Sequence, residues 1–114
     1  MEEFPGRSIR IVDTLGAALG QGLHVYLTAK KKLEGATLEE AVAFAEDIKL
    51  RVVHWFTVDD LVYLKRGGRV SAATAVLGTM LNIKPVLHVD NEGHLINVTK
   101  ARGRKAAIDH LVKR

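Results

Sequence analysis

Residues 53–58, VHWFTV, form a continuous apolar run rich in β-branched and aromatic side chains. Such a run is typical of a strand that is buried on both faces. It follows two segments with the apolar spacing of helices, 15–33 and 37–52, and these follow a short apolar run at 9–14. The order strand, helix, helix, strand favours a parallel crossover, so the first part of the chain is expected to be one piece of an α/β layer.

The second part of the chain follows a different pattern. Pro85 cannot continue a helix, so residues 82–90 are expected to be extended, and Gly93 suits the left-handed position of a hairpin turn. The predicted fold class is therefore α/β: a parallel strand-helix-helix-strand unit, then a helix, an antiparallel hairpin and a C-terminal helix. The first unit offers only two strands, and a lone hairpin is only marginally stable, so neither can be a complete domain. We therefore expect parts of two domains, residues 1–68 and 69–114.

The composition narrows the functional classes. The chain of 114 residues has no cysteine, which excludes disulfides and thiolate metal sites and suits a cytoplasmic protein. No run of about 18 apolar residues is present, so no membrane span is expected. The net charge of +4 is concentrated in residues 100–114, which carry six Lys and Arg against Asp109 alone. Aromatic residues make up only 5%, so a general nucleic-acid-binding surface is not expected.

The stretch Tyr63–Ser71, YLKRGGRVS, has two interpretations. In the first, Asp59 caps a short helix, Gly67 takes the left-handed position that ends it, and Ser71 caps the next helix. In the second, Arg69 and Ser71 lie at the domain junction, where a helix N-terminus and an arginine suit an anionic group. The adjacent glycines do not fit the phosphate-loop pattern, so a nucleotide site is not expected.

Neither a metal site nor a catalytic site is predicted. Four residues around the hairpin could imitate a metal site: His88, Asp90, Glu92 and His94. However, the strands of a hairpin place residues on opposite faces, and two histidines without a third fixed ligand seldom hold zinc. The consecutive carboxylates Asp59 and Asp60 do not converge on one helix face. We therefore expect a protein that is not an enzyme.

Four ordered blocks of the sequence resemble the DegV family of bacterial fatty-acid-binding proteins. They are VDTLGAALGQGLHVYLTAKK (12–31), FTVDDLVYLKRGGRVS (56–71), LNIKPVLHVDNEGHL (81–95) and KARGRKAA (100–107). The resemblance implies a parallel α/β domain followed by a domain built on an antiparallel sheet, with a long-chain fatty acid held between them. It further implies a carrier without a cofactor, which hands the bound acid to a kinase that phosphorylates the carboxylate.

Two groups of ligand-contacting residues follow from the resemblance and the junction. The headgroup side is expected to use Thr14, Arg69 and Ser71. The acyl wall is expected to use Leu19, Gly20, Gly22, Leu23, Leu61, Leu64, Leu77, Met80 and Ile83. The family's Thr-Ser-x-Pro-Ser block, which grips the carboxylate, does not occur in this sequence, so weak or absent lipid binding is expected for the isolated chain.

Two other functions stay open at this stage. The basic segment 100–114 could bind nucleic acid, and such binding would weaken steeply with salt. The chain could also be a ligand-free scaffold, because incomplete domains expose apolar faces and strand edges. For the isolated chain, this second alternative predicts a homo-oligomer.

Overall fold

The computed structural model describes residues 4–69 and 82–114, and contacts divide the chain into two compact units, Met1–Val52 and Val53–Arg114. The expected residues Ser71, Leu77 and Met80, and the helix expected before Pro85, lie outside the described residues. In the described part, no helix combines the length and the apolar character needed to cross a bilayer.

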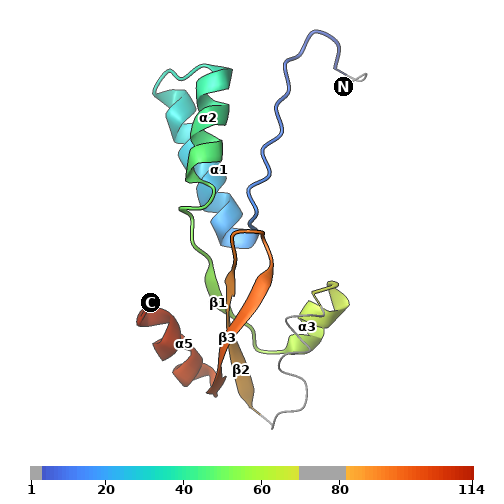
Figure 1. Cartoon of the computed structure of the whole chain (residues 1–114), viewed down its shortest axis with the longest axis vertical. Helices are drawn as coiled ribbons and strands as arrows, with labels where there is room; N and C mark the ends of the chain where they lie inside the picture. The colour runs from blue at the N-terminus through green and yellow to red at the C-terminus, as the bar shows by residue number, and fades with distance from the viewer. Residues whose placement is uncertain (1–3, 70–81) are drawn as a thin grey trace. The chain divides into compact units, whose positions relative to one another are not determined.

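The first unit is a pair of helices preceded by an extended segment (Figure 1). Helix α1 spans Ala18–Leu33 and helix α2 spans Leu38–Ile48. The Thr37 side chain accepts the Glu40 backbone N–H at 3.2 Å, and the Glu40 carboxylate accepts the Thr37 backbone N–H at 2.8 Å. This capping box fixes the start of α2, as the sequence predicted. Helix α1 begins later than Leu15, because that residue is left-handed with a φ of 51°.

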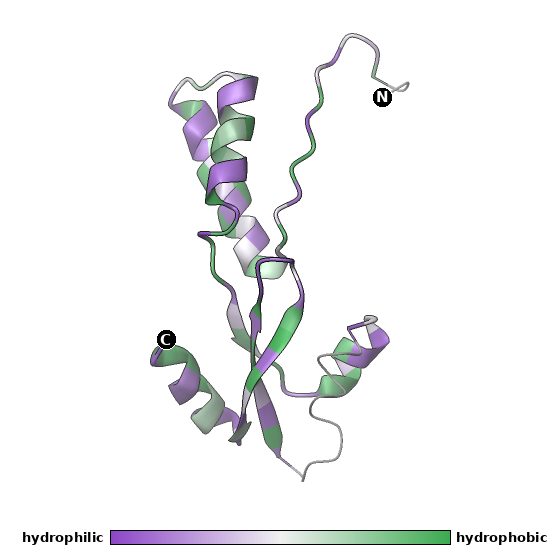
Figure 2. Cartoon of the chain, in the orientation of Figure 1, coloured by the Kyte–Doolittle hydropathy of each residue, from purple (hydrophilic) through white to green (hydrophobic). Residues whose placement is uncertain are grey.

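Small side chains allow the two helices to approach each other closely. Ala41 and Ala45 of α2 are buried, as are Ile48 and, in the turn before α2, Ala36. Polar and apolar residues are mixed along both helices, so each helix keeps an exposed polar side (Figure 2). The core of the first unit is therefore thin, and the rest of its apolar surface is accessible.

The second unit is a three-stranded antiparallel sheet in the order β1-β2-β3. Strand β1 spans Trp55–Thr57, β2 spans Ile83–Val89 and β3 spans Leu95–Arg102, while the helices are α3, Leu61–Arg66, and α5, Arg104–Val112. A bulge interrupts the β2–β3 ladder between Val86 and Leu87. The hairpin and the C-terminal helix expected from the sequence are confirmed.

Strand β2 is the central strand, and it carries the core of the second unit. Val86 and Leu87 are consecutive and fully buried, so β2 is covered on both faces. Val86 packs with Ala101 and Ala107, against which Trp55 and Leu111 also lie. Helix α5 therefore covers one face of the sheet.

The mixed α/β class is confirmed, and the sheet that the structure describes is antiparallel. Residues 9–14 belong to no strand, and β1 pairs antiparallel with β2, in the register Trp55 to His88 and Thr57 to Val86. The hairpin offers β1 a free ladder edge, and the β1 side chains are half-buried rather than fully buried. The domain boundary expected at residue 68 stays a prediction about the complete family fold.

Candidate ligand-binding groove

A groove of about 740 Å³ lies in the first unit, between the extended segment and helices α1 and α2. Both helices and the segment supply its walls. The lining residues are Arg10, Val12 and Thr14 from the segment, Gln21, His24, Val25, Thr28, Ala29 and Lys32 from α1, and Leu38, Ala41, Val42 and Ala45 from α2.

His24 is the buried histidine of the groove lining. Its side chain is 4% exposed, and its Nε2 donates to the Ala45 carbonyl oxygen at 2.8 Å. Because this contact joins α1 to α2, it sets the spacing of the two helical walls. The Thr28 hydroxyl donates to the His24 carbonyl oxygen at 2.9 Å, so that polar group of the wall has a partner within α1.

The walls are apolar and one end of the groove is cationic. Val25 and Ala29 follow each other by one turn on α1, and Leu38 and Val42 do so on α2. Lys32 lies in the last turn of α1, next to the α1–α2 turn.

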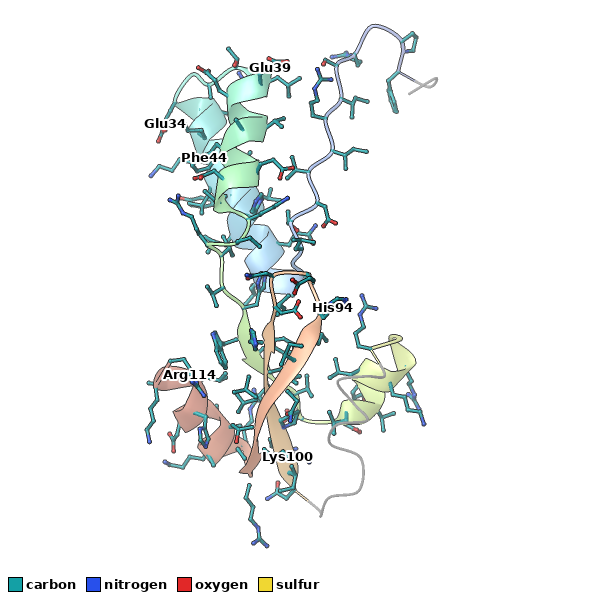
Figure 3. The ribbon with its side chains drawn as sticks, in the orientation of Figure 1. Glu34, Glu39, Phe44, His94, Lys100 and Arg114 are labelled. Carbon is teal, nitrogen blue, oxygen red and sulfur yellow. The ribbon has the colours of Figure 1, made fainter. Side chains whose placement is uncertain are left out.

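At the same end, an Arg10 guanidinium nitrogen lies 3.9 Å from a Glu39 carboxylate oxygen. Figure 3 shows Glu39 and Glu34 at this end of the helical pair. Among the described residues Lys32 forms no ion pair, so its charge is available to an anionic group.

Of the residues expected at the headgroup, the structure brings Thr14 into this groove. The Thr14 hydroxyl donates to the Gly16 carbonyl oxygen at 3.5 Å, a long contact that leaves the hydroxyl able to turn toward a ligand. Arg69 is exposed in the second unit and donates to the Gly67 carbonyl oxygen. The two headgroup residues described thus belong to different units, and a shared role for them stays a prediction.

The residues expected at the acyl wall also divide between the units. Leu19 and Leu23 are 92% and 48% exposed on α1, outside the groove lining, and Gly20 and Gly22 lie between them. The other three are half-buried in the second unit: Leu61, Leu64 and Ile83. Their role toward a ligand stays a prediction.

Several groove residues had a signal in the sequence that could have been used. The apolar face of the second helix, with Leu38, Ala41 and Ala45, was visible in the helical spacing, but it was assigned to packing alone. Arg10 and Val12 alternate in the run IRIVDT, and that alternation separates a groove-facing side from an outward side. Lys32 looked only like a favourable charge at a helix end.

The YLKRGG stretch folds as a helix end. Lys65 and Arg66 lie in the last turn of α3, and Gly67 donates to the Tyr63 carbonyl oxygen at 2.9 Å. The left-handed residue is Gly68, with a φ of 82°, and not Gly67 as expected. The described part of this stretch thus ends a helix, as the structural interpretation expected, while the expected Ser71 cap lies outside the described residues.

Asp60, not Asp59, caps α3, because its side chain accepts the Val62 N–H at 2.8 Å. Asp59 is left to pair with two cations: the Lys84 Nζ lies 3.6 Å from its Oδ1, and an Arg104 guanidinium nitrogen lies 3.3 Å from the same atom. The neighbouring carboxylates therefore have separate structural roles.

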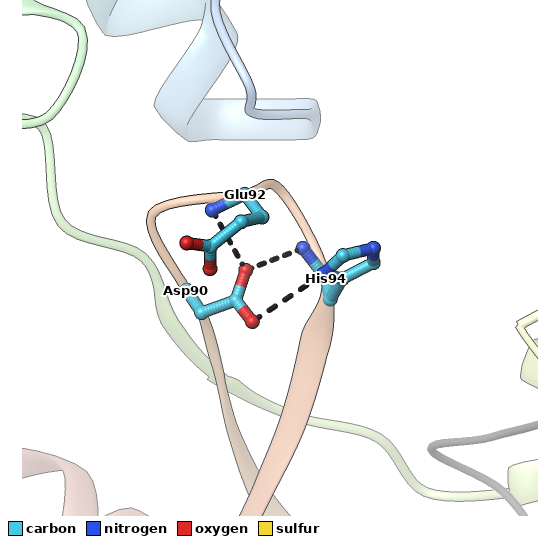
Figure 4. A group of neighbouring side chains, drawn as sticks. All are labelled: Asp90, Glu92 and His94. Carbon is cyan, nitrogen blue, oxygen red and sulfur yellow. Dashed lines mark hydrogen bonds and ion pairs between the residues drawn. The ribbon is translucent and has the colours of Figure 1, made fainter.

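The hairpin turn gathers Asp90, Glu92 and His94, whose ligand atoms lie within 4.8 Å of one another (Figure 4). Asp90 Oδ1 accepts the backbone N–H groups of His94 at 2.8 Å and of Glu92 at 3.0 Å. These bonds, with that to His94 first, hold the pKa of the Asp90 carboxyl below its ordinary value. The Asp90 carboxylate is thus engaged in the turn.

The basic segment near the C-terminus is partly neutralised within the second unit. Besides the Arg104–Asp59 pair, the Lys105 Nζ lies 3.0 Å from the Asp109 carboxylate, and the Arg114 guanidinium lies 4.8 Å from the centre of the Trp55 ring. Figure 3 shows Lys100 on the sheet and Arg114 beyond α5. These contacts do not favour a continuous cationic surface of the kind that tracks a nucleic-acid backbone.

Comparisons with known proteins identify the family. A family model described as "Uncharacterised protein, DegV family" matches residues 1–114. The DegV domain-containing protein YteA of Lactococcus lactis is 49% identical over 114 residues, which are 100% of this chain and 39% of that protein. This chain spans 38–39% of the length of the first curated relatives that it matches.

Solved structures of the same family are also similar to this chain, and two of them serve as examples. A DegV family protein from Thermus thermophilus, described by its fatty acid binding, has a TM-score of 0.81 and 42% identity, over 98% of this chain and 39% of that one. A DegV family protein from Ruminococcus gnavus, described with vaccenic acid, has a TM-score of 0.80 and 26% identity, over 98% of this chain and 40% of that one. The ordered motifs, the helical pair and the antiparallel hairpin are thus those of a known family, and the chain belongs to the DegV family.

Proposed function

We propose that this chain is part of a cytoplasmic fatty-acid carrier of the DegV type, which presents a bound long-chain fatty acid to a kinase and is not itself an enzyme. The observation that carries the proposal is the groove of the first unit, which has apolar walls and, at one end, a lysine that forms no ion pair with any described residue. The description of the Thermus relative by its fatty acid binding gives the chemical class of the ligand.

The groove has the size and the chemistry that an acyl chain needs. Ligand sites are commonly about 300–1,000 Å³, and the groove has about 740 Å³. Each methylene that leaves water contributes about 0.8 kcal/mol, so an acyl chain gains most of its affinity along the Val25 and Val42 walls. At the cationic end, Lys32 suits the carboxylate better than Arg10, because Arg10 already has Glu39 beside it.

We expect weaker binding by this chain than by a full-length relative. The chain covers 39% of the Thermus protein, and the Thr-Ser-x-Pro-Ser block of the family is not in its sequence. A carboxylate with only Lys32 and the Thr14 hydroxyl near it keeps part of its desolvation cost. Arg69 and Ser71 remain proposed headgroup residues of the complete site.

Native mass spectrometry with added palmitic acid tests the proposal, with the denatured mass as the control. A non-covalent adduct is expected with the wild-type chain at high ligand concentration. The variant Val42→Asp places a charge on the apolar wall and is expected to abolish the adduct. Its matched control is Ala43→Asp, which puts the same charge on an exposed position of the same helix.

A second matched pair tests the headgroup end. Lys32→Gln is expected to weaken binding, while Lys30→Gln, which removes a charge outside the groove lining, is expected to have little effect. No adduct with the wild-type chain at any palmitate concentration, or equal loss in both members of each pair, would exclude this groove as the lipid site.

A further inference from the structure

Asp59 joins three elements of the second unit. It lies in the connection between β1 and α3, and its backbone carbonyl oxygen accepts a hydrogen bond from the Lys84 Nζ at 2.7 Å. Its carboxylate Oδ1 lies 3.6 Å from the same Nζ and 3.3 Å from an Arg104 guanidinium nitrogen. Lys84 belongs to the central strand β2, and Arg104 is the first residue of α5. One residue therefore links the start of α3 to the sheet and to the C-terminal helix.

The two cations around Asp59 differ in their exposure to water. The Lys84 side chain is 17% exposed, whereas that of Arg104 is 52% exposed. An ammonium group that has lost most of its water needs polar partners, and Asp59 supplies both a carbonyl oxygen and a carboxylate. The contact with Lys84 is therefore the stronger one, and the more exposed pair with Arg104 is screened by salt.

Helix α5 begins without a negative charge of its own. Its N-cap residue Gly103 has no side chain, its first turn contains no acidic residue, and it starts with Arg104 and Lys105. Cations are unfavourable at this positive end of a helix dipole. By pairing with Arg104, Asp59 sets a carboxylate against one of these two cations from a distant part of the sequence.

The residue after Asp59 fixes the start of α3. Asp60 caps the helix, because its side chain accepts the Val62 N–H at 2.8 Å. At the other end of α3, the Arg69 N–H donates to the Leu64 carbonyl oxygen at 2.8 Å. The chain from Asp60 to Arg69 is thus internally hydrogen-bonded, and its direction depends on how Asp59 is held.

We propose that Asp59 is a positioning residue, which holds α3 and the following Arg69 in a fixed orientation to the sheet. Lys84 carries most of this restraint and Arg104 the smaller part. The carbonyl contact with Lys84 persists when the carboxylate charge is removed, so the two parts of the restraint can be separated by mutation. The inference goes beyond the proposed lipid function and does not depend on it, because it concerns the geometry of the second unit alone.

Hydrogen–deuterium exchange followed by mass spectrometry tests the proposal on the whole chain. Lys84→Met removes both contacts and is expected to raise the exchange rate of residues 61–69 about ten-fold, since hydrogen bonds to charged groups are among the stronger ones. Asp59→Asn keeps the carbonyl contact and is expected to raise this rate about two- to five-fold. Lys84→Arg keeps a charge and donors, so its exchange is expected to stay closer to that of the wild-type chain.

Asp109→Asn is the matched control. It also removes one carboxylate charge and one ion pair, because the Asp109 carboxylate lies 3.0 Å from the Lys105 Nζ. Both residues belong to α5, so this pair links no two elements, and the exchange of residues 61–69 is expected to stay unchanged. Urea unfolding followed by the fluorescence of Trp55 first establishes that each variant is folded.

Faster exchange of residues 61–69 in Lys84→Met than in Asp59→Asn, with the strand residues 83–102 of Asp59→Asn unchanged, supports the proposal. Unchanged exchange of residues 61–69 in Asp59→Asn overturns it, and this exposed variant decides alone where Lys84→Met does not fold. An equal rise at 61–69 and 83–102 in Asp59→Asn also overturns it, because the carboxylate would then stabilise the whole unit rather than position α3. The same rise at 61–69 in Asp109→Asn overturns it as a general effect of charge.

Discussion

Replacement of His24 by alanine tests how the groove is held open. His24 is 4% exposed, and its Nε2 donates to the Ala45 carbonyl oxygen at 2.8 Å. Loss of this hydrogen bond removes about 1 kcal/mol, and loss of the packed ring with partial collapse of the space removes about 1–2 kcal/mol more. The variant is therefore expected to lower the free energy of unfolding of the first unit by about 2–3 kcal/mol.

Urea unfolding can assign this loss to one unit. Ellipticity at 222 nm reports the helices of both units, and α1 and α2, with 16 and 11 residues, are those of the first unit. The only tryptophan, Trp55, lies in the second unit and reports it by fluorescence. His24→Ala is expected to shift the ellipticity transition and to leave the fluorescence transition in place.

Two further variants separate packing from hydrogen bonding. His24→Phe keeps an aromatic ring but no donor, so it is expected to cost less than the alanine variant. His110→Ala, at an exposed position of α5, is expected to change stability by no more than about 0.5 kcal/mol. An ellipticity transition unchanged in His24→Ala would refute the role of His24 as the link between the helical walls.

Four other predictions follow from individual residues. Thr37→Ala is expected to cost about 1 kcal/mol by thermal unfolding followed at 222 nm. The Thr37 backbone N–H and hydroxyl hold the pKa of Glu40 below its ordinary value of 4.5, so its contribution is present above pH 4.5 and lost as the pH falls further. Glu40→Gln should flatten that acid limb of the stability profile. Leu87→Ala, at a fully buried position, is expected to cost about 3 kcal/mol in the fluorescence transition of Trp55. Gly103→Ala is expected to cost about 1–3 kcal/mol in the same assay, because φ of 85° with ψ of 162° is accessible almost only to glycine.

The helices and the hairpin could be predicted because local chemistry determines them. Thr37 and Glu40 form the capping box that the sequence indicated, and Gly93 takes the left-handed position of the turn, with a φ of 83°. Pro85 lies in β2. This position agrees with the expectation that residues 82–90 are extended because Pro85 cannot continue a helix. Each of these features depends on residues only a few positions apart. It can therefore be recognised in a single sequence.

The strand pairing and the groove could not be predicted in the same way, because they depend on residues far apart in the chain. The run VHWFTV fits a parallel or an antiparallel ladder equally well, and its partner β2 begins 28 residues after Trp55. The groove needs His24 against Ala45, and neither residue marks a contact when read alone. Helical spacing identified the apolar face of α2, but it could not show that the face remains open.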